Sequence, residues 1–177
     1  VDADDLLHPG RIAGLLAIAG DTAADVIADD LVPFGGQSGT TLLTPLGLKS
    51  TWRPDALDLL RTAEGGAPVP VGYLKPMIRR SALGFLRYRT ELPIGEDFDL
   101  LLRLALSGAR VAVAAKPWYL YRRHATSTSH RLPPEQAGAI LAGIEALTRD
   151  HPIWAETAAG AAASPRPPEK TTRWRAS

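Results

Sequence analysis

The chain has 177 residues, 45% of them hydrophobic and 22% charged, so it is long enough for one domain with a substantial core and is not disordered by composition. Its 20 lysine and arginine residues nearly balance 19 aspartate and glutamate residues, and the net charge of +1 argues against non-specific nucleic-acid binding. The absence of cysteine excludes disulfides, thiolate zinc sites and a cysteine nucleophile, and it is typical of a reducing compartment.

The N-terminus shows no targeting signal. Val1 leads directly into acidic residues and Met77 is the only methionine, so we expect a piece cut from a longer protein. No apolar stretch approaches the roughly 20 residues that a membrane helix needs. We therefore expect a water-soluble chain.

Helical periodicity alternates with β-branched runs. The predicted elements, in chain order, are a helix over 9–19, a strand over 25–33, a turn-rich loop over 34–39, a helix over 54–63, an extended stretch over 73–78, a helix over 96–107, strands over 110–115 and 118–123, and a helix over 132–149. The helix over 54–63 is expected to follow a capping region at 50–51, and the helix over 96–107 should be buried and should pair Asp99 with Arg103. This alternation predicts an α/β layered domain.

Three carboxylates crowd one turn near the N-terminus, at Asp2, Asp4 and Asp5. Like charges this close repel each other unless a cation neutralises them, and hard divalent ions such as Mg²⁺ or Mn²⁺ prefer oxygen ligands. The pattern is compatible with a metal-binding turn. A solvated turn rich in aspartate is the alternative.

A second acidic motif, Glu96 and Asp97, opens the buried helix over 96–107. Successive helical positions point about 100° apart, so one carboxylate can be held structurally while the other projects into a cleft as a base for a hydroxyl nucleophile. The alternative is an ordinary acidic first turn that complements the helix dipole.

A third group follows the last predicted strand, where cations, imidazoles and hydroxyls are dense over 121–130. Arg122 and Arg123 offer planar forks to phosphate oxygens, and a neutral His124 can complete the coordination of a metal already held by carboxylates. An exposed loop without a ligand is the alternative.

Taken in order, the three groups resemble the second half of a family 2 glycosyltransferase with the GT-A fold. The acidic turn with residues 6–11 resembles the metal-binding turn and helix of that family, residues 96–104 its acidic motif, and residues 121–129 its closing segment. Residues 72–80 lie where the family places acceptor-side residues. The resemblance covers about 1–131 and is greatest to bacterial exopolysaccharide transferases of the succinoglycan-assembly type.

The resemblance implies a role for each group. Asp4, helped by Asp2, would bind a Mg²⁺ or Mn²⁺ ion that bridges the diphosphate of a nucleotide sugar, and His124 would be a further ligand or diphosphate contact. Asp97 would be the general base that takes a proton from the acceptor hydroxyl in a single inverting displacement. The residues implied in substrate binding are Tyr73, Lys75, Glu96, Arg122, Arg123 and Ser129.

The implied fold is the C-terminal part of a GT-A domain, a mixed sheet flanked by helices, over 1–131. A helical segment over 132–157 and a disordered tail over 158–177 would follow. The first half of the family's domain, which binds the nucleotide base and ribose, would precede Val1. We therefore expect the isolated chain to be an inactive fragment with little turnover.

The parent enzyme would transfer a sugar from a nucleotide-sugar donor to a hydroxyl of a growing exopolysaccharide or lipid-linked oligosaccharide. The expected partners are thus the donor and a carbohydrate or lipid-linked acceptor, with no nucleic acid. The resemblance implies a cytoplasmic location and allows peripheral association with the inner face of the membrane.

Two other functions stay open on the sequence. An apolar strand that ends in two spaced aspartates also occurs in haloacid-dehalogenase-like phosphatases, although Leu6 stands where that family expects threonine or valine. A non-catalytic carbohydrate-binding or interaction module is the second, with Trp118, Tyr119 and Tyr121 as candidate stacking residues. Metal dependence would separate these classes, because a binding module does not need Asp2, Asp4 or Asp97.

Overall fold

The computed structural model describes residues 2–35, 40–63, 69, 71–92, 94–123 and 142–143. The strands are β1 (Leu6–Leu7), β2 (Val26–Phe34), β3 (Met77–Ile78) and β4 (Val111–Arg122). The α-helices are α1 (Arg11–Thr22), α2 (Ala56–Ala63), α3 (Arg80–Leu83) and α4 (Glu96–Leu106), and short 3-10 helices lie at Thr44–Leu46 (η1) and Val71–Tyr73 (η2).

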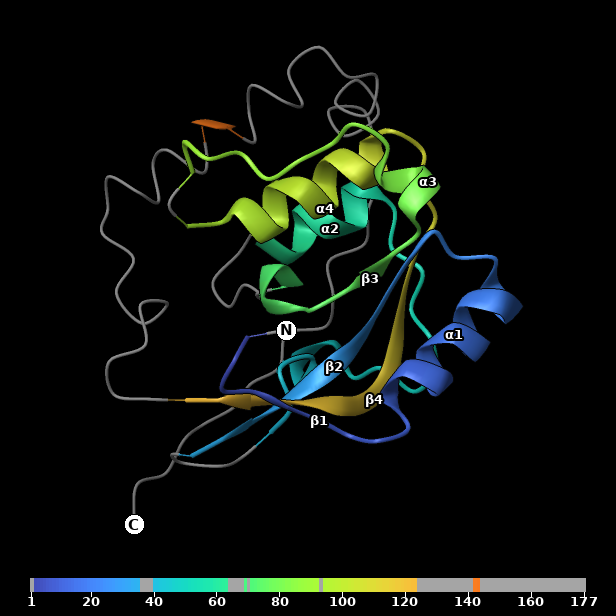
Figure 1. Ribbon diagram of the computed structural model, residues 1–177, viewed down its shortest axis with the longest axis vertical. Helices are drawn as coiled ribbons and strands as arrows, with labels where there is room; N and C mark the ends of the chain where they lie inside the picture. The colour runs from blue at the N-terminus through green and yellow to red at the C-terminus, as the bar shows by residue number, and fades with distance from the viewer. Residues whose placement is uncertain are drawn as a thin grey trace, which may run out of the picture.

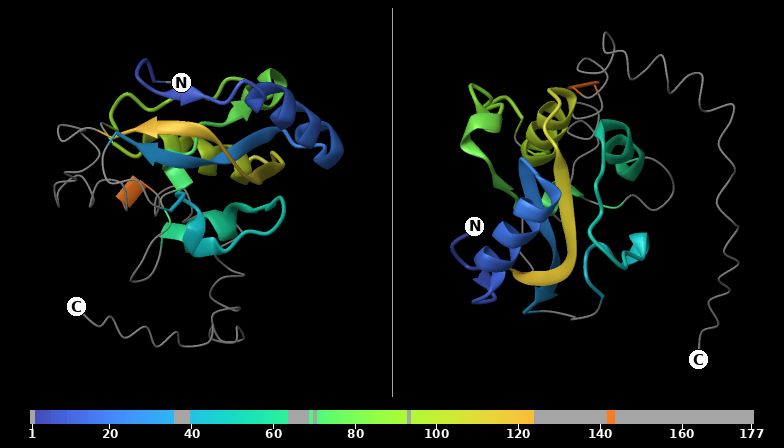
Figure 2. Two further views of the ribbon diagram at one scale, coloured as in Figure 1. Left: turned by 90° about the horizontal axis from the view of Figure 1, so that it is seen from below. Right: turned by 90° about the vertical axis from the view of Figure 1, so that its right-hand side faces the viewer.

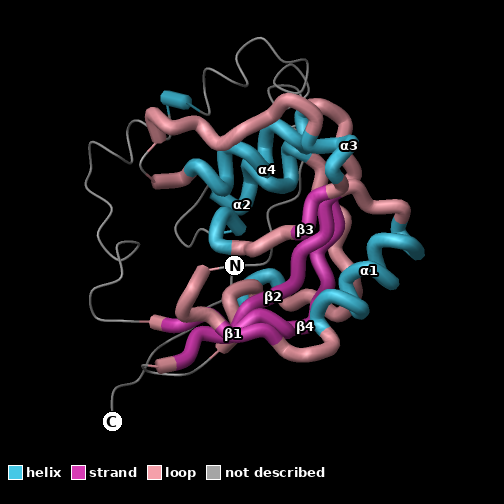
Figure 3. Tube along the Cα trace, viewed as in Figure 1, coloured by secondary structure: helices cyan, strands magenta, loops and turns pink. Residues whose placement is uncertain are grey.

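A four-stranded sheet in the order β1-β4-β2-β3 forms the centre of the fold (Figure 1). The two central strands, β2 and β4, are parallel, while β1 and β3 pair antiparallel at the two edges. Between β2 and β4 the chain passes through α2, β3, α3 and α4 (Figure 3). The expected mixed sheet flanked by helices is confirmed.

The two faces of the sheet are covered by different helices because alternate side chains of β2 and β4 point to opposite sides. Val26 and Val111 pack in the larger core with α4, whereas Ile27 and Ala112 pack with Leu15 of α1. Figure 2 shows α1 and α2 on opposite sides of the sheet. Helices cover both faces of the sheet. Ligands of parallel sheets usually bind outside the carboxyl ends of the strands, so we expect the site at the C-terminal ends of β2 and β4.

The expected strands over 110–115 and 118–123 form one continuous, strongly bent strand, β4. The register shifts where Asp29 pairs with Ala114 but Leu31 pairs with Tyr119, so β4 has extra residues at this point. A bulge of this kind bends a strand, and it tolerates Pro117, which has no N–H to donate to a ladder. The proline therefore marks a bend and not a break between strands.

Helix α1 packs closely on β4 because residue 14 is glycine. A Cβ atom placed on Gly14 would lie 2.6 Å from Cη2 of Trp118, which is closer than side chains can approach. The helix also runs past the expected end at residue 19 to Thr22, and the next residue, Ala23, has a positive φ of 51°. Gly20 therefore does not end the helix, because Ala23 supplies the left-handed turn at its C-terminus.

Other predicted boundaries differ from the structure in identifiable ways. Asp55 and not the 50–51 region caps α2: its carboxylate accepts a hydrogen bond from the Asp58 backbone N–H at 2.7 Å. The extended stretch over 73–78 contributes only β3 to the sheet, after the turn of η2. Two elements, β1 and α3, are too short for periodicity to reveal, at two and four residues.

The helix over 96–107 is confirmed as α4, and Arg103 Nη2 lies 2.6 Å from Asp99 Oδ2 as its spacing predicted. Most of the expected loop over 34–39, the tail over 158–177 and nearly all of the helix over 132–149 lie outside the described residues. Among the residues that are described, no helix is long and apolar enough to cross a membrane.

Asp25 makes the fold sensitive to acid. Its carboxylate accepts hydrogen bonds from the Arg110 side chain and backbone N–H, which lowers the pKa of Asp25 from 3.8 to about 2. A depressed pKa in the folded state means that the stabilisation is present above about pH 4 and is lost as the pH falls toward 2. Asp25→Asn should therefore reduce the fall in the free energy of unfolding across this window, measured by urea unfolding.

The matched control is Asp21→Asn, which changes an exposed carboxylate on α1. This variant should keep the acid sensitivity of the parent chain. An unchanged pH slope in Asp25→Asn would contradict the assignment.

Candidate functional site

The acidic turn at residues 2–5 is fastened to the end of β4 by Asp5. One carboxylate oxygen of Asp5 accepts a hydrogen bond from the Tyr119 hydroxyl at 2.6 Å, and the other accepts one from the Arg122 backbone N–H at 2.7 Å. Burial and the hydrogen bond to Asp5 raise the pKa of Tyr119, so its hydroxyl remains a donor. Asp5 is thus committed to structure.

Beneath the turn lies a buried ion pair between Arg11 of α1 and Asp29 of β2. Both residues are at most 2% exposed, and Arg11 Nη2 is 2.7 Å from Asp29 Oδ1 while its Nε donates to both carboxylate oxygens. The Arg11 guanidinium also lies 5.0 Å from the centre of the Tyr119 ring, within cation–π range. Its Nη2 further donates to the Lys75 backbone carbonyl at 2.6 Å. One side chain therefore fixes the positions of α1, β2, β4 and the segment that carries Lys75.

The Lys75 side chain joins the two acidic motifs. Its Nζ lies 3.4 Å from Asp2 Oδ2 and 3.3 Å from Asp97 Oδ2. Burial alone would lower the pKa of Lys75, but the charges of Asp97 and Asp2 outweigh it and raise the pKa above its usual value. The lysine is consequently a cation held between two carboxylates that are 95 positions apart in the sequence.

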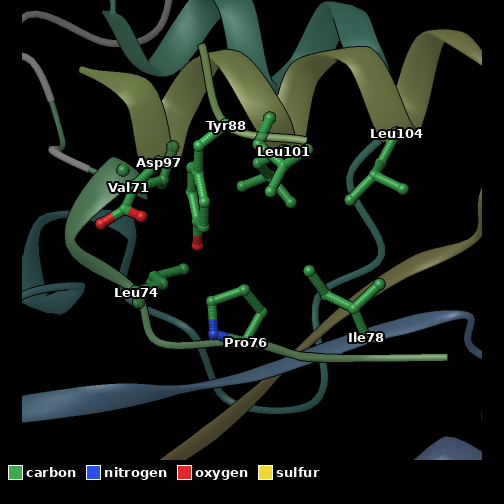
Figure 4. Close-up of a pocket in the computed structure, with 10 residues that line it drawn as sticks. Val71, Leu74, Pro76, Ile78, Tyr88, Asp97, Leu101 and Leu104 are labelled. Carbon is green, nitrogen blue, oxygen red and sulfur yellow. The ribbon is translucent and has the colours of Figure 1, made fainter. Parts of the chain in front are cut away.

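A small cleft opens beside Asp97, between α4 and the η2–β3 segment (Figure 4). Its lining is apolar apart from Asp97 and Tyr88, and includes Val71, Leu74, Pro76, Ile78, Leu101 and Leu104. Burial, the charge of Asp97 and a hydrogen bond to Asp97 raise the pKa of Tyr88. The Asp97 side chain is 32% exposed, so its carboxylate is accessible from solvent.

The arginines of the closing segment have different surroundings. Arg122 Nε donates to the Asp4 backbone carbonyl at 2.8 Å, and the guanidinium stacks 4.5 Å from the centre of the Phe34 ring. Its neighbour Arg123 is exposed and anchors through its backbone N–H to the Phe34 carbonyl at 2.8 Å. Arg122 thus braces the acidic turn, and the Arg123 side chain faces solvent.

Of the four other residues that the resemblance implies, the structure describes Tyr73 and Glu96. Tyr73 meets Tyr121 edge to face, with ring centres 6.2 Å apart, at the side of the site. Glu96 is half-buried at the start of α4, next to Asp97. His124 and Ser129 lie outside the described residues.

The described carboxylates suit a hard cation by chemistry but do not form a cage. No group of three or more His, Asp or Glu side chains within the described part of the chain is arranged to hold a metal ion. Mg²⁺ and Mn²⁺ are often held by only one or two carboxylates, with substrate phosphates and water completing the shell. Asp2, which is 54% exposed, and Asp4 fit that kind of donor set.

Comparison with known proteins relates the chain to polysaccharide synthesis. It is 33% identical over 172 residues to the succinoglycan biosynthesis protein ExoU of Rhizobium meliloti (strain 1021), across 85% of this chain and 49% of ExoU. It is 29% identical over 161 residues to the succinoglycan biosynthesis protein ExoO of the same organism, across 86% of this chain and 45% of ExoO. The chain thus spans about half the length of these curated relatives. No family model matches it.

The fold is similar to that of S. aureus TarS 1-349 in complex with UDP, with a TM-score of 0.57 and 16% identity over 82% of this chain and 38% of the TarS chain. A structure of TarS with UDP-GlcNAc gives the same TM-score and identity and covers 41% of its chain. The GT-A fold is confirmed. The resemblance to family 2 glycosyltransferases and to succinoglycan biosynthesis proteins is likewise confirmed.

Several residues that shape the candidate site carry no signal in the sequence. Arg11 and Asp29 look like surface charges, because only the packing of α1 on the sheet shows that both are buried. Tyr88 lies in a segment without periodicity, and its proximity to Asp97 depends on how that segment crosses α4. Among the candidate stacking residues, Tyr119 is 1% exposed.

Arg11→Met should destabilise the fold by about 3–5 kcal/mol, because it leaves the buried Asp29 carboxylate without its cation. The free energy of unfolding in urea measures the loss. The double variant Arg11→Met/Asp29→Leu should recover part of it, since no unpaired charge remains. Arg53→Met, which removes an exposed arginine, should change stability little. Equal effects of Arg11→Met and Arg53→Met would show that the pair is not a structural anchor.

Proposed function

We propose that the chain carries the metal-binding, acceptor-binding and base residues of an inverting glycosyltransferase of exopolysaccharide biosynthesis. The observation that supports this best is the approach of the two acidic motifs, since Asp2 and Asp97 each lie within 3.4 Å of the same Lys75 ammonium. A transferase that displaces a diphosphate needs a cation site and a base side by side. The relatedness to ExoU and ExoO supports polysaccharide synthesis as the setting.

The proposed donor is a nucleotide sugar. The TarS structures with a similar fold contain UDP and UDP-GlcNAc, which supports a nucleoside diphosphate as the leaving group here. Asp4 and Asp2 would hold the Mg²⁺ or Mn²⁺ ion, which when bound supplies positive charge next to the diphosphate. His124 is the proposed further ligand or diphosphate contact.

The proposed chemical step uses Asp97 as the general base. Its carboxylate takes the proton of the acceptor hydroxyl, the acceptor oxygen forms a bond to the anomeric carbon, and the bond from that carbon to the diphosphate oxygen breaks with its electrons. Configuration at the anomeric carbon inverts. The Lys75 ammonium lies next to Asp97 and offsets negative charge close to the leaving diphosphate. Arg123, whose side chain is exposed, is the better placed of the two arginines to reach phosphate oxygens.

The acceptor is proposed to be a carbohydrate, either free or lipid-linked, that enters past Tyr73 and the cleft beside Asp97. Glu96 and Ser129 are proposed further contacts to substrate. A cytoplasmic protein that associates with the inner face of the membrane fits a lipid-linked acceptor.

The carbohydrate-binding alternative has less support from the aromatic residues. Tyr119 is buried, and Trp118 packs against Gly14 of α1, so neither presents a free stacking face to a sugar ring. Tyr121 pairs with Tyr73. An enzyme with a polar site therefore accounts better for these residues than an aromatic binding platform does.

The metal and base roles can be separated by substitution. When Mn²⁺ and UDP are titrated into the full-length protein in a calorimeter, binding should require both the ion and the nucleotide. It should weaken at least about tenfold in Asp4→Asn, because a charged metal ligand is lost. Asp97→Asn should keep this binding and lower the rate of sugar transfer by the full-length protein about 10²–10⁴-fold.

Asp58→Asn is the matched control, because it changes a carboxylate on α2 outside the site. It should alter neither binding nor transfer. Binding that is indifferent to Asp4, or a transfer rate unchanged in Asp97→Asn, would contradict the proposal.

A further inference from the structure

A short segment after α3 presents an apolar side chain entirely to solvent. Phe85 is 101% exposed, far more than any other large hydrophobic residue among those described as exposed. The turn that presents it depends on Gly84, whose φ of 51° and ψ of −123° suit glycine alone. Phe85 therefore extends into solvent from an ordered turn and is not part of the hydrophobic core.

The same segment is strongly basic although the chain as a whole is nearly neutral. Residues 79–92 contain four arginines and one glutamate, a net charge of +3, whereas the whole chain has +1. Two of the arginines, Arg79 and Arg89, pair with carboxylates. Among the described residues no carboxylate pairs with Arg80 or Arg87, and both are exposed. Uncompensated positive charge thus lies within five positions of Phe85.

This segment is braced and not loosely extended. Arg87 Nη1 donates to the backbone carbonyls of Gly84 and Leu86 at 3.0 and 2.6 Å. Arg103 of α4 donates to the Arg87 carbonyl at 2.7 Å and pairs with Asp99, which also holds Arg89. A preorganised segment loses little conformational freedom when it binds a surface.

The segment also contributes to the candidate site. Three positions after Phe85, Tyr88 lines the cleft beside Asp97 (Figure 4). In Figure 1 the chain after α3 runs along the outside of α4 toward its N-terminal end. Asp97 is the second residue of α4. The segment that presents Phe85 therefore also reaches the cleft, through Tyr88.

We propose that the turn at Gly84–Leu86, with Arg80 and Arg87, is a docking element for an anionic phospholipid surface. A lone aromatic side chain flanked by arginines matches such a surface, because the ring enters the headgroup region while the guanidinium groups contact lipid phosphates. The inference rests on the proposed membrane association and deepens it by naming the contact, in the same segment that lines the Asp97 cleft with Tyr88.

The test is sedimentation of the 177-residue chain with vesicles of phosphatidylcholine, with and without phosphatidylglycerol. Partition should be much stronger with the anionic lipid. Phe85→Ser should weaken it about tenfold, since a ring no longer leaves water, and Arg80→Ser about fivefold, as expected for one basic group near an anionic surface. Because the Phe85 side chain is fully exposed, its replacement should leave thermal unfolding unchanged.

Two matched controls keep the test specific. Leu16→Ser removes a 57% exposed apolar side chain from α1, and Lys49→Ser removes an exposed cation elsewhere, so neither should change partition. The proposal would be overturned if the chain bound neutral and anionic vesicles equally, or if Leu16→Ser weakened binding as much as Phe85→Ser. It would also be overturned if Phe85→Ser abolished self-association of the chain and left vesicle binding unchanged. The assay contains no donor or acceptor, so its failure would leave the proposed sugar transfer untouched.

Discussion

The buried ion pair between Arg11 and Asp29 sets the geometry on which the candidate site depends. Its guanidinium touches the carboxylate of a central strand, the ring of Tyr119 and the backbone of Lys75. Two of these residues in turn hold acidic motifs, Tyr119 through its hydrogen bond to Asp5 and Lys75 through its ammonium. Burying two charges is costly unless they are well paired. The pair therefore holds α1, the central strands and the Lys75 segment in fixed relative positions.

The carboxylates of the two acidic motifs divide into those that maintain the fold and those left for chemistry. Asp5 is used by Tyr119 and the Arg122 backbone, and Asp99 by Arg103 and Arg89. Asp2 and Asp97 instead meet at a single lysine and stay partly exposed. Each motif thus contains its own anchor, which lets the neighbouring carboxylate project from a rigid backbone.

Much of the fold could be predicted because long elements carry a period. The helix over 96–107 and the strand over 25–33 follow from spacing alone. The family resemblance pointed to two acidic segments, and the structure brings Asp2 and Asp97 of these segments to the same lysine. The bridge made by Lys75 could not be derived, because it depends on long-range packing that brings residues 2 and 97 together. The sequence predicts two strands where the structure has β4, because proline usually interrupts a strand. Whether a strand continues through Pro117 depends on its pairing with β2, which allows a bulge there.

The bend in β4 has a consequence for how the chain can vary in length. Residues before the bend belong to the core, and residues after it lie under the site. The number of residues in the bend therefore decides which side chains of the second half face the site. Adding one residue within the bend would turn Tyr119 to the opposite side and bring Trp118 to its register position, so Asp5 would lose its hydroxyl donor while the first half of the strand stayed in place. A change of two residues would return the tyrosine to the same side of the sheet but displace it by roughly 6–7 Å along the strand, out of reach of Asp5. The length of this short stretch therefore links core packing to the integrity of the site.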